Sequence, residues 1–307
     1  MSIASNLGFP RIGPTRELKR ALEDYWAGRS SAEELASAAA GIRRANWHRQ
    51  AELGIEHIPS NDFSLYDHVL DTAVMLGAVP RRFAERTGLD DVERYFAMAR
   101  GLSDGHASVP AMEMTKWFDT NYHYIVPELE PEQELRLASA KPIDEFMEAK
   151  ALGVITRPVL LGPLSFLLLA KNHRTRQPTL VFLDAVLPVY EQLLAQLRIA
   201  GAAWVQLDEP CLVFDLTPSS AERTRRRMSG SGQRARRYSS PPTSATSGRI
   251  SRRRSRSPLP RSIWISYVRR ISWRPRSIVC HSTWRCRSAS SMDATCGARI
   301  WTSHSHG

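Results

Sequence analysis

Apolar positions follow a helical period along the early part of the chain. After Ser30-Ser31-Ala32-Glu33, which resembles an N-terminal capping box, apolar residues recur every three or four positions until a glycine follows. The pattern predicts a helix that begins at this box and ends near Gly54, with a buried face formed by Leu35, Ala38, Ile42 and Ala45.

Short apolar runs between helical stretches predict buried strands. The predicted strands are residues 55–59, 157–163 and 204–210. Residues 181–199 predict a long helix with an apolar stripe, interrupted at Pro188. The last strand carries Asp208 and Glu209 at its C-terminal end. Repeated strand–helix units with polar residues at strand C-termini indicate an α/β fold of the (β/α)8 barrel type.

Hydrophobic order stops near residue 220. Residues 223–307 are rich in Arg and Ser and show neither hydrophobic period. The whole chain carries a net charge of +11, yet residues 1–222 hold 22 basic and 30 acidic side chains, whereas residues 223–307 hold 20 Arg and one acid, Asp293. We therefore expect an ordered part, residues 1–220, and a disordered tail, residues 221–307.

The composition of the tail indicates a shift of reading frame. Disordered segments are normally poor in Trp, yet four Trp stand among these arginines. If the true frame begins one nucleotide earlier, the first two bases of each observed codon are the last two of a true codon. With suitable third bases, residues 237–248 then read AVFLTTYFGDIG, residues 262–269 read IHLDLVRA and residues 289–302 read GVVDGRNVWRADLD. These strings are strand-like, so we interpret the tail as out of frame.

The N-terminal sequence, the lengths of the apolar runs and the cysteine spacing argue against secreted, membrane-spanning and disulfide-rich proteins. The start, Met1 to Pro10, lacks a basic stretch followed by an apolar run, and the longest apolar run, residues 159–170, is too short to cross a bilayer. We therefore expect a cytoplasmic protein without a membrane partner. The four cysteines form no CxxC pair, which argues against a disulfide framework and against a metal site.

Five stretches of the chain carry long, specific motifs: Leu7–Gly13 with Arg16–Lys19, Asp62–Phe63 with Tyr66–Leu70, Glu113–Tyr124, Pro158–Pro163 and Trp204–Pro210. Together they resemble the N-terminal domain of cobalamin-independent methionine synthase over essentially all of residues 5–217. The out-of-frame strings TTYFG, HLDLV and GRNVWRADL resemble the family's next strands. The resemblance implies an incomplete (β/α)8 barrel, the first of two, with about five of the eight strands within residues 1–220.

The resemblance also implies an activity: methyl transfer from 5-methyltetrahydropteroyltri-L-glutamate to L-homocysteine, the last step of methionine biosynthesis, with zinc and without cobalamin. A zinc-bound thiol loses its proton and stays nucleophilic, and the folate nitrogen must be protonated as it leaves. The family holds the zinc, the homocysteine site and the proton donor in its second barrel and is expected to be monomeric. We therefore expect this chain to be a fragment that is inactive alone, without catalytic residues or metal ligands of its own.

The residues that the resemblance assigns to the folate donor and its glutamate tail are Arg16, Glu17, Leu18, Lys19 and Lys116. Cations at the C-terminal ends of barrel strands suit a string of carboxylates. Taken without the family, Arg16 and Lys19 are typical of a solvated helix start. Lys116 stands three residues after Glu113, and it is equally typical of a structural ion pair with that residue.

Other candidates have a simpler interpretation. Asp208 and Glu209 resemble paired catalytic carboxylates, but we expect them to orient loops. His68 and the stretch Tyr122–Tyr124 indicate packed, hydrogen-bonded side chains rather than metal ligands. The late residues that look like ligands are products of the shifted frame: Cys280, Cys286, Cys296, His304 and His306.

Two other functions compete with an enzyme fragment. A nucleic-acid-binding protein could act through arginine runs such as Arg225–Arg227 and Arg252–Arg254, which would bind any polyanion electrostatically. The tail has neither regular Arg-Ser dipeptides nor RGG repeats, so we expect no specific nucleic acid. A stand-alone single-barrel methyltransferase or decarboxylase would need its own zinc ligands or an arginine-lined pocket, and residues 1–217 suggest neither.

Overall fold

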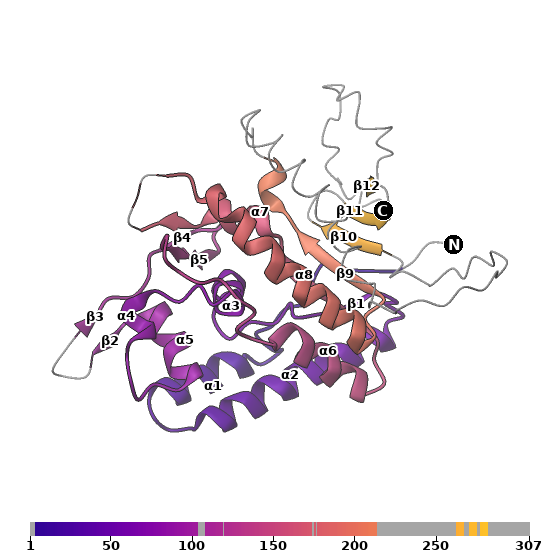
Figure 1. Cartoon of the computed structure of the whole chain (residues 1–307). Coiled ribbons are helices and arrows are strands. Elements are labelled where there is room, and N and C mark those ends of the chain that lie inside the picture. Colours follow the sequence, from indigo (N-terminus) through magenta and orange to yellow (C-terminus); the bar gives the residue numbers. More distant parts are fainter. Residues whose placement is uncertain are drawn as a thin grey trace, which may run out of the picture.

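The computed structural model in Figure 1 describes residues 4–103, 108–118, 120–173, 175 and 177–213, and the backbone of three later strands. Up to Val213 the elements are α1 (Glu17–Trp26), α2 (Ala32–Glu52), β1 (Ile58–Ser60), α3 (His68–Met75), α4 (Arg81–Ala84), α5 (Asp91–Arg100), β2 (Leu102–Ser103), β3 (Ser108–Val109), β4 (Met114–Lys116), β5 (His123–Ile125), β6 (Glu128–Leu129), α6 (Lys141–Ala151), β7 (Thr156–Leu161), α7 (Pro163–Leu169), β8 (Lys171–Asn172), η1 (Thr179–Phe182), α8 (Leu183–Ala200), β9 (Trp204–Asp208) and η2 (Pro210–Val213). The later strands are β10 (Ser262–Ser266), β11 (Arg270–Arg274) and β12 (Ser277–His281).

A parallel sheet forms the centre of the fold, in the strand order β1-β7-β9-β10. Ile58 pairs with Thr156, and Leu160 pairs with Leu207, so the strands all end at the same edge. Helix α6 contacts β1 and β7, and α8 packs against α6 and α7 (Figure 1). The α/β class and the predicted strands are therefore confirmed, and every strand end lies within three residues of its predicted position. The strands described here do not close into a ring, so the barrel is incomplete.

The remaining strands form small two-stranded units. Strands β6 and β8 pair in parallel, whereas β2 with β3, β4 with β5 and β11 with β12 are antiparallel. In the β4–β5 hairpin, Lys116 lies opposite His123. Lys116, a predicted donor contact, is exposed on this hairpin, next to Trp117.

Two large clusters of buried side chains hold these elements together. The first joins the sheet to α7 and α8 through residues such as Leu160, Phe166 and Leu193. The second lies among α1, α2 and α5 and includes Leu18 and Phe96. Burying one such side chain stabilises the fold by about 2 kcal/mol, so both layers are fixed by apolar contacts.

Helix α2 differs in detail from its prediction. Its N-cap is Ser31, not Ser30: the Ser31 hydroxyl accepts from Glu34 N and the Glu34 carboxylate accepts from Ser31 N, which completes the capping box one residue later than expected. Ala45 is exposed, and the buried face instead consists of Leu35, Ala39, Ile42, Trp47 and Gln50. Counted from Leu35, a period of 3.6 residues places Ala39 rather than Ala38 on the buried face. The predicted positions Ala38 and Ala45 depart from that period.

Helix α8 continues through Pro188, where the sequence predicted an interruption. The proline lies near the N-terminal end of the helix, close to the turns whose amide groups need no intrahelical acceptor. Residues Thr179–Ala200 form a stretch long and apolar enough to cross a membrane by length and composition. Val186, Leu193 and Leu197 of this stretch are nevertheless fully buried in the first cluster, as in the core helix of a globular domain.

Strands β10 to β12 lie within the stretch predicted to be disordered. Strand β10 pairs with β9 over its whole length, and β11 pairs with β12. Their sequences, SIWIS, RISWR and SIVCH, are short runs with Ile, Val or Trp, which have high strand propensity even without a clear hydrophobic period. The other tail residues, including the arginine runs and the late cysteines and histidines other than Cys280 and His281, lie outside the described residues.

Candidate functional site

A cavity of about 450 Å³ opens at the C-terminal ends of β1, β7 and β9. Its walls come from residues 7–11, from the loop after β1 with the start of α3, from the β4–β5 hairpin and from the first turn of α6. This is the edge where parallel strands of α/β folds place their functional side chains, and the volume is typical of a small-molecule site.

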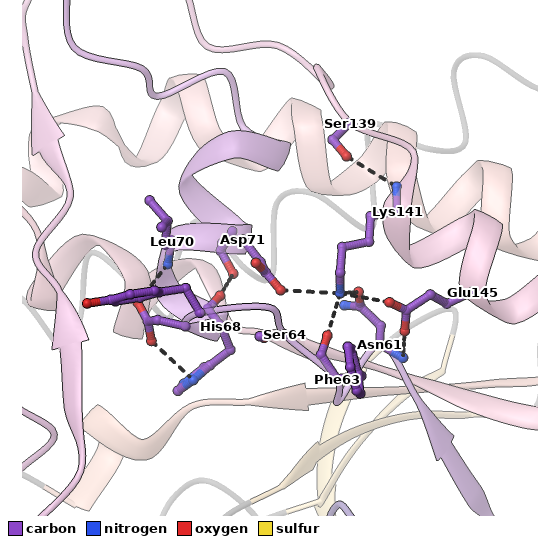
Figure 2. Close-up of polar contacts among 12 residues, drawn as sticks. Asn61, Phe63, Ser64, His68, Leu70, Asp71, Ser139, Lys141 and Glu145 are labelled. Atoms are coloured by element: carbon purple, nitrogen blue, oxygen red, sulfur yellow. Dashed lines mark hydrogen bonds and ion pairs between the residues drawn. The ribbon is translucent and has the colours of Figure 1, made fainter. Parts of the chain in front are cut away.

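The loop after β1 is fixed by Lys141, the first residue of α6 (Figure 2). The Lys141 ammonium donates to Asn61 Oδ1 (2.9 Å) and to Phe63 O (2.7 Å). It also forms ion pairs with Asp71 (3.2 Å) and Glu145 (3.1 Å). Burial alone would lower the pKa of Lys141, but the two carboxylates raise it above its ordinary value. A permanently charged ammonium therefore joins β1, α3 and α6.

Asn61 takes a left-handed backbone conformation, with a φ of 58°, which lets the chain turn sharply out of β1. Its amide N donates to Glu145 (3.0 Å), and its side-chain Nδ2 donates to Val159 O (2.7 Å) on β7. Asparagine tolerates this conformation better than most residues. The turn aims the following residues at the cavity.

A second polar group surrounds the start of α3. Asp67 caps the helix by accepting from Leu70 N (2.9 Å) and also accepts from Ile125 N (3.0 Å) in β5. The buried Tyr95 hydroxyl donates to Asp71 (2.7 Å). His68 Nδ1 lies 3.5 Å from Asp67, and its ring packs edge-on against Trp117 with centroids 4.5 Å apart. The predicted packing role of His68 is thus visible in its contacts.

The loop after β1 and the N-terminal segment bring two further charged side chains to the wall of the cavity. Asp62 Oδ2 accepts from Phe9 N (2.7 Å), and burial raises the pKa of this carboxyl to about 6. Arg11 donates to Ser64 O and, at 2.6 Å, to Tyr66 O. These bonds attach the N-terminal segment to the loop after β1, so the wall of the cavity does not depend on apolar packing alone.

The pair Asp208–Glu209 is divided between two environments. Asp208 lines the cavity and accepts from Gln206 Nε2 (2.8 Å). Glu209 is buried on the other side, where it accepts from Leu164 N (3.0 Å) and Ser165 N (2.7 Å) at the start of α7, and burial raises its pKa to about 7. Successive side chains at a strand end point in opposite directions, so the two carboxylates do not act as a pair. The prediction that they orient loops fits the Glu209 contacts.

The residues assigned to the folate donor near α1 lie away from the cavity. Arg16 is the exposed N-cap of the helix, with a φ of 63°. Glu17 accepts from Thr15 Oγ1 (2.8 Å), and Lys19 lies 3.6 Å from Glu23. The Leu18 side chain is buried in the second cluster, so only its main chain is available to a ligand. None of these residues is among those that line the cavity.

Lys116 is exposed at the end of β4 and does not line the cavity either, although the next residue, Trp117, does. The expected structural partner, Glu113, instead forms an ion pair with Lys171 on β8. The four polar residues predicted to contact the donor thus lie at the surface, three at the start of α1 and Lys116 on the hairpin.

Lys141, Asp62 and Trp117 are site residues that sequence reasoning did not single out as such. The position of Asp62 just after a predicted strand was a usable signal, because such positions line the site of a barrel. Nothing local marks Lys141, whose partners are distant in the sequence. Within the described part of the chain, no group of three or more His, Cys, Asp or Glu side chains is placed to hold a metal ion, so these residues do not fit a zinc site.

Comparison with known proteins identifies the family. Residues 3–236 match the family model described as cobalamin-independent synthase, N-terminal domain. A 5-methyltetrahydropteroyltriglutamate–homocysteine methyltransferase of Caulobacter vibrioides is 57% identical over 237 residues, covering 72% of this chain and 30% of that protein. The protein of the same name from Parvibaculum lavamentivorans is 60% identical over 216 residues, covering 70% and 28%. The chain thus corresponds to less than a third of the length of these relatives.

Solved structures with some likeness include a B12-independent methionine synthase from Shewanella sp. W3-18-1 in complex with selenomethionine, with a TM-score of 0.42 and 16% identity over 61% of this chain and 46% of that one. A putative vitamin-B12 independent methionine synthase from Listeria monocytogenes has a TM-score of 0.43 and 15% identity over 71% and 58%. The sequence match covers well over half of the chain, and the chain therefore belongs to the cobalamin-independent synthase family, within its N-terminal domain.

Proposed function

We propose that the chain is the N-terminal part of a 5-methyltetrahydropteroyltriglutamate–homocysteine methyltransferase and helps to hold the folate donor for methyl transfer to L-homocysteine. The observation that carries the proposal is the match of residues 3–236 to the family's N-terminal domain. The names of the relatives support the reaction class. The description of the matching family supports the absence of cobalamin.

The proposed contacts of the donor's glutamate tail are Arg16, Glu17, Leu18, Lys19 and Lys116. Arg16, Lys19 and Lys116 are exposed cations, and Lys19 keeps 53% of its side chain accessible. Exposed ammonium and guanidinium groups attract a string of carboxylates, but water and salt screen each contact. The chain's part in the reaction is therefore to bind and orient the donor, with an affinity that falls as salt is added.

The chemical steps are proposed to occur elsewhere in the family's enzyme. Zinc would supply a nucleophilic homocysteine thiolate, and the described residues do not form a site for it. We accordingly propose that the 307-residue chain alone transfers no methyl group. We also propose a cytoplasmic, monomeric protein that uses neither a membrane nor a specific nucleic acid. The packing of α8 in the core supports only the part of this proposal that excludes a membrane.

The test is complementation of a methionine auxotroph that lacks every methionine synthase. One strain receives the present reading frame, and a second receives the gene with one base corrected between the codons for residues 210 and 230 and with its downstream region restored. Growth of the second strain alone supports both the family function and the shifted frame. Growth of the first strain would overturn the view that this chain is inactive. If neither strain grows, the result contradicts the proposed reaction.

A further inference from the structure

The cavity at the ends of β1, β7 and β9 is separate from the proposed donor contacts, because none of Arg16, Lys19 and Lys116 lines it. Its floor is apolar and consists of Val159, Leu160 and Leu161 at the end of β7. An inference about its ligand therefore does not depend on the proposed folate role. The electrostatics of the lining decide which kind of molecule fits.

The cationic side chains of the lining are already engaged. Lys141 has three ammonium protons and is surrounded by four oxygen acceptors at 2.7–3.2 Å, so it has no proton left for a ligand. Arg11 donates from both terminal nitrogens to main-chain carbonyls. Burial lowers the pKa of His68, and the neighbouring Asp67 opposes this shift. A ligand carboxylate or phosphate would therefore find little positive charge in the cavity.

The opposite holds for Asp62. Its carboxylate lines the cavity and accepts from Phe9 N, but among the described residues no Lys, Arg or His nitrogen lies within ion-pairing distance. Burial outweighs the more distant attraction of Lys141 and raises the pKa of the Asp62 carboxyl, so the buried carboxylate is costly, and an approaching cation would offset that cost. Asp67 and Asp71 differ, because main-chain amides or Lys141 already satisfy them.

The aromatic wall favours the same class of ligand. Trp117 and Tyr122 line the cavity from the β4–β5 hairpin, and the Trp117 ring is held by its edge-on contacts with His68 (4.5 Å) and Tyr124 (5.8 Å). Indole faces attract organic cations as well as apolar groups. We propose that this cavity binds a small organic ammonium ion, with the ammonium against Asp62 and the apolar body between Trp117 and the floor formed by β7.

Three ligands of the same shape and different charge test the proposal on the 307-residue chain. Isothermal titration at pH 7.5 compares 2-phenylethylammonium, neutral 2-phenylethanol and anionic 3-phenylpropionate. We expect the ammonium ion to bind at least tenfold more tightly than either of the others. Equal affinity for all three, tighter binding of the anion, or no binding of the ammonium ion would overturn the proposal.

Two variants locate the charge. Asp62→Asn keeps an oxygen acceptor for Phe9 N and removes the charge, and it should weaken ammonium binding at least tenfold while leaving binding of the alcohol unchanged. Glu52→Gln, an exposed acid at the end of α2, is the matched control and should leave both affinities unchanged. Unchanged ammonium binding in a folded Asp62→Asn chain, judged by near-ultraviolet circular dichroism, would overturn the assignment. If the Asp62→Asn variant does not fold, quenching of Trp fluorescence by the ammonium ion is measured in the parent chain and in Trp117→Leu. Loss of the quenching in Trp117→Leu supports the site. Quenching that persists in Trp117→Leu contradicts it.

Discussion

Lys141 and Glu145 lie one helical turn apart on α6 and together hold the main chain of the loop after β1. The ammonium lies 3.1 Å from one carboxylate oxygen and donates to Phe63 O, while the other carboxylate oxygen accepts from Asn61 N at 3.0 Å. The two side chains thus satisfy an acceptor and a donor of the same loop. Figure 2 shows both side chains directed at Asn61 and Phe63 of this loop, and Asn61 lines the cavity.

Replacement of Lys141 by methionine should therefore destabilise the fold. The change would leave Asp71 and Glu145 without their shared counter-charge, and breaking a buried ion pair costs about 3–5 kcal/mol. Because the Lys141 side chain keeps 29% of its surface accessible, we expect about 2 kcal/mol, measured from the urea midpoint. Lys19→Met, at an exposed pair on α1, is the control, and an equal loss in both variants would contradict the role of Lys141.

Glu209 should make stability fall as pH rises. Burial raises its pKa from 4.5 to about 7, so between these values the folded chain holds a proton that the unfolded chain has released. The folded state is favoured below this window and loses up to about 3 kcal/mol as pH rises through it. Urea unfolding at pH 5 and pH 8 measures the loss. Glu209→Gln should reduce the difference between the two pH values, and an undiminished difference would show that other groups cause it.

The proposed donor contacts predict a dependence on the length of the glutamate tail. Combined Arg16→Ala, Lys19→Ala and Lys116→Ala substitutions should weaken binding of the triglutamate donor, while binding of the monoglutamate changes little. Titration at low and at physiological salt separates the charge effect, because the difference should shrink as salt rises. Lys150→Ala, a change of one cation at the end of α6, serves as the control. Equal losses for both donors would argue against contacts with the tail.

The shifted frame predicts a specific change in the gene. Sequencing across the codons for residues 210–230 should place the shift of one base there, and the restored frame should contain TTYFG, HLDLV and GRNVWRADL in that order. Mass spectrometry of the protein made from the repaired gene checks the same strings as peptides. An unaltered frame that lacks them would refute the interpretation of the tail.

Sequence patterns predicted the elements better than the site. The strand positions and the span of α2 depend on local periodicity, which the chain displays directly. The Lys141 network could not be predicted in this way, because Asn61, Asp71 and Glu145 meet only after β1, α3 and α6 have packed. Asp208 and Glu209 are an intermediate case: their adjacency suggested a pair, whereas the alternation of side chains along a strand already separates them.

The contact between Glu209 and Gly162 links two positions that are far apart in the chain. A side chain at residue 162 would overlap the Glu209 carboxyl group, so a carboxylate at one position requires glycine at the other. Neither position can change freely first: Gly162→Ala alone creates a clash, and loss of Glu209 alone leaves the amides of Leu164 and Ser165 without their acceptor. In natural variants of this domain, we therefore expect residues 162 and 209 to change together. Because either single change is unfavourable, few mutational routes are open to the junction between β7 and α7.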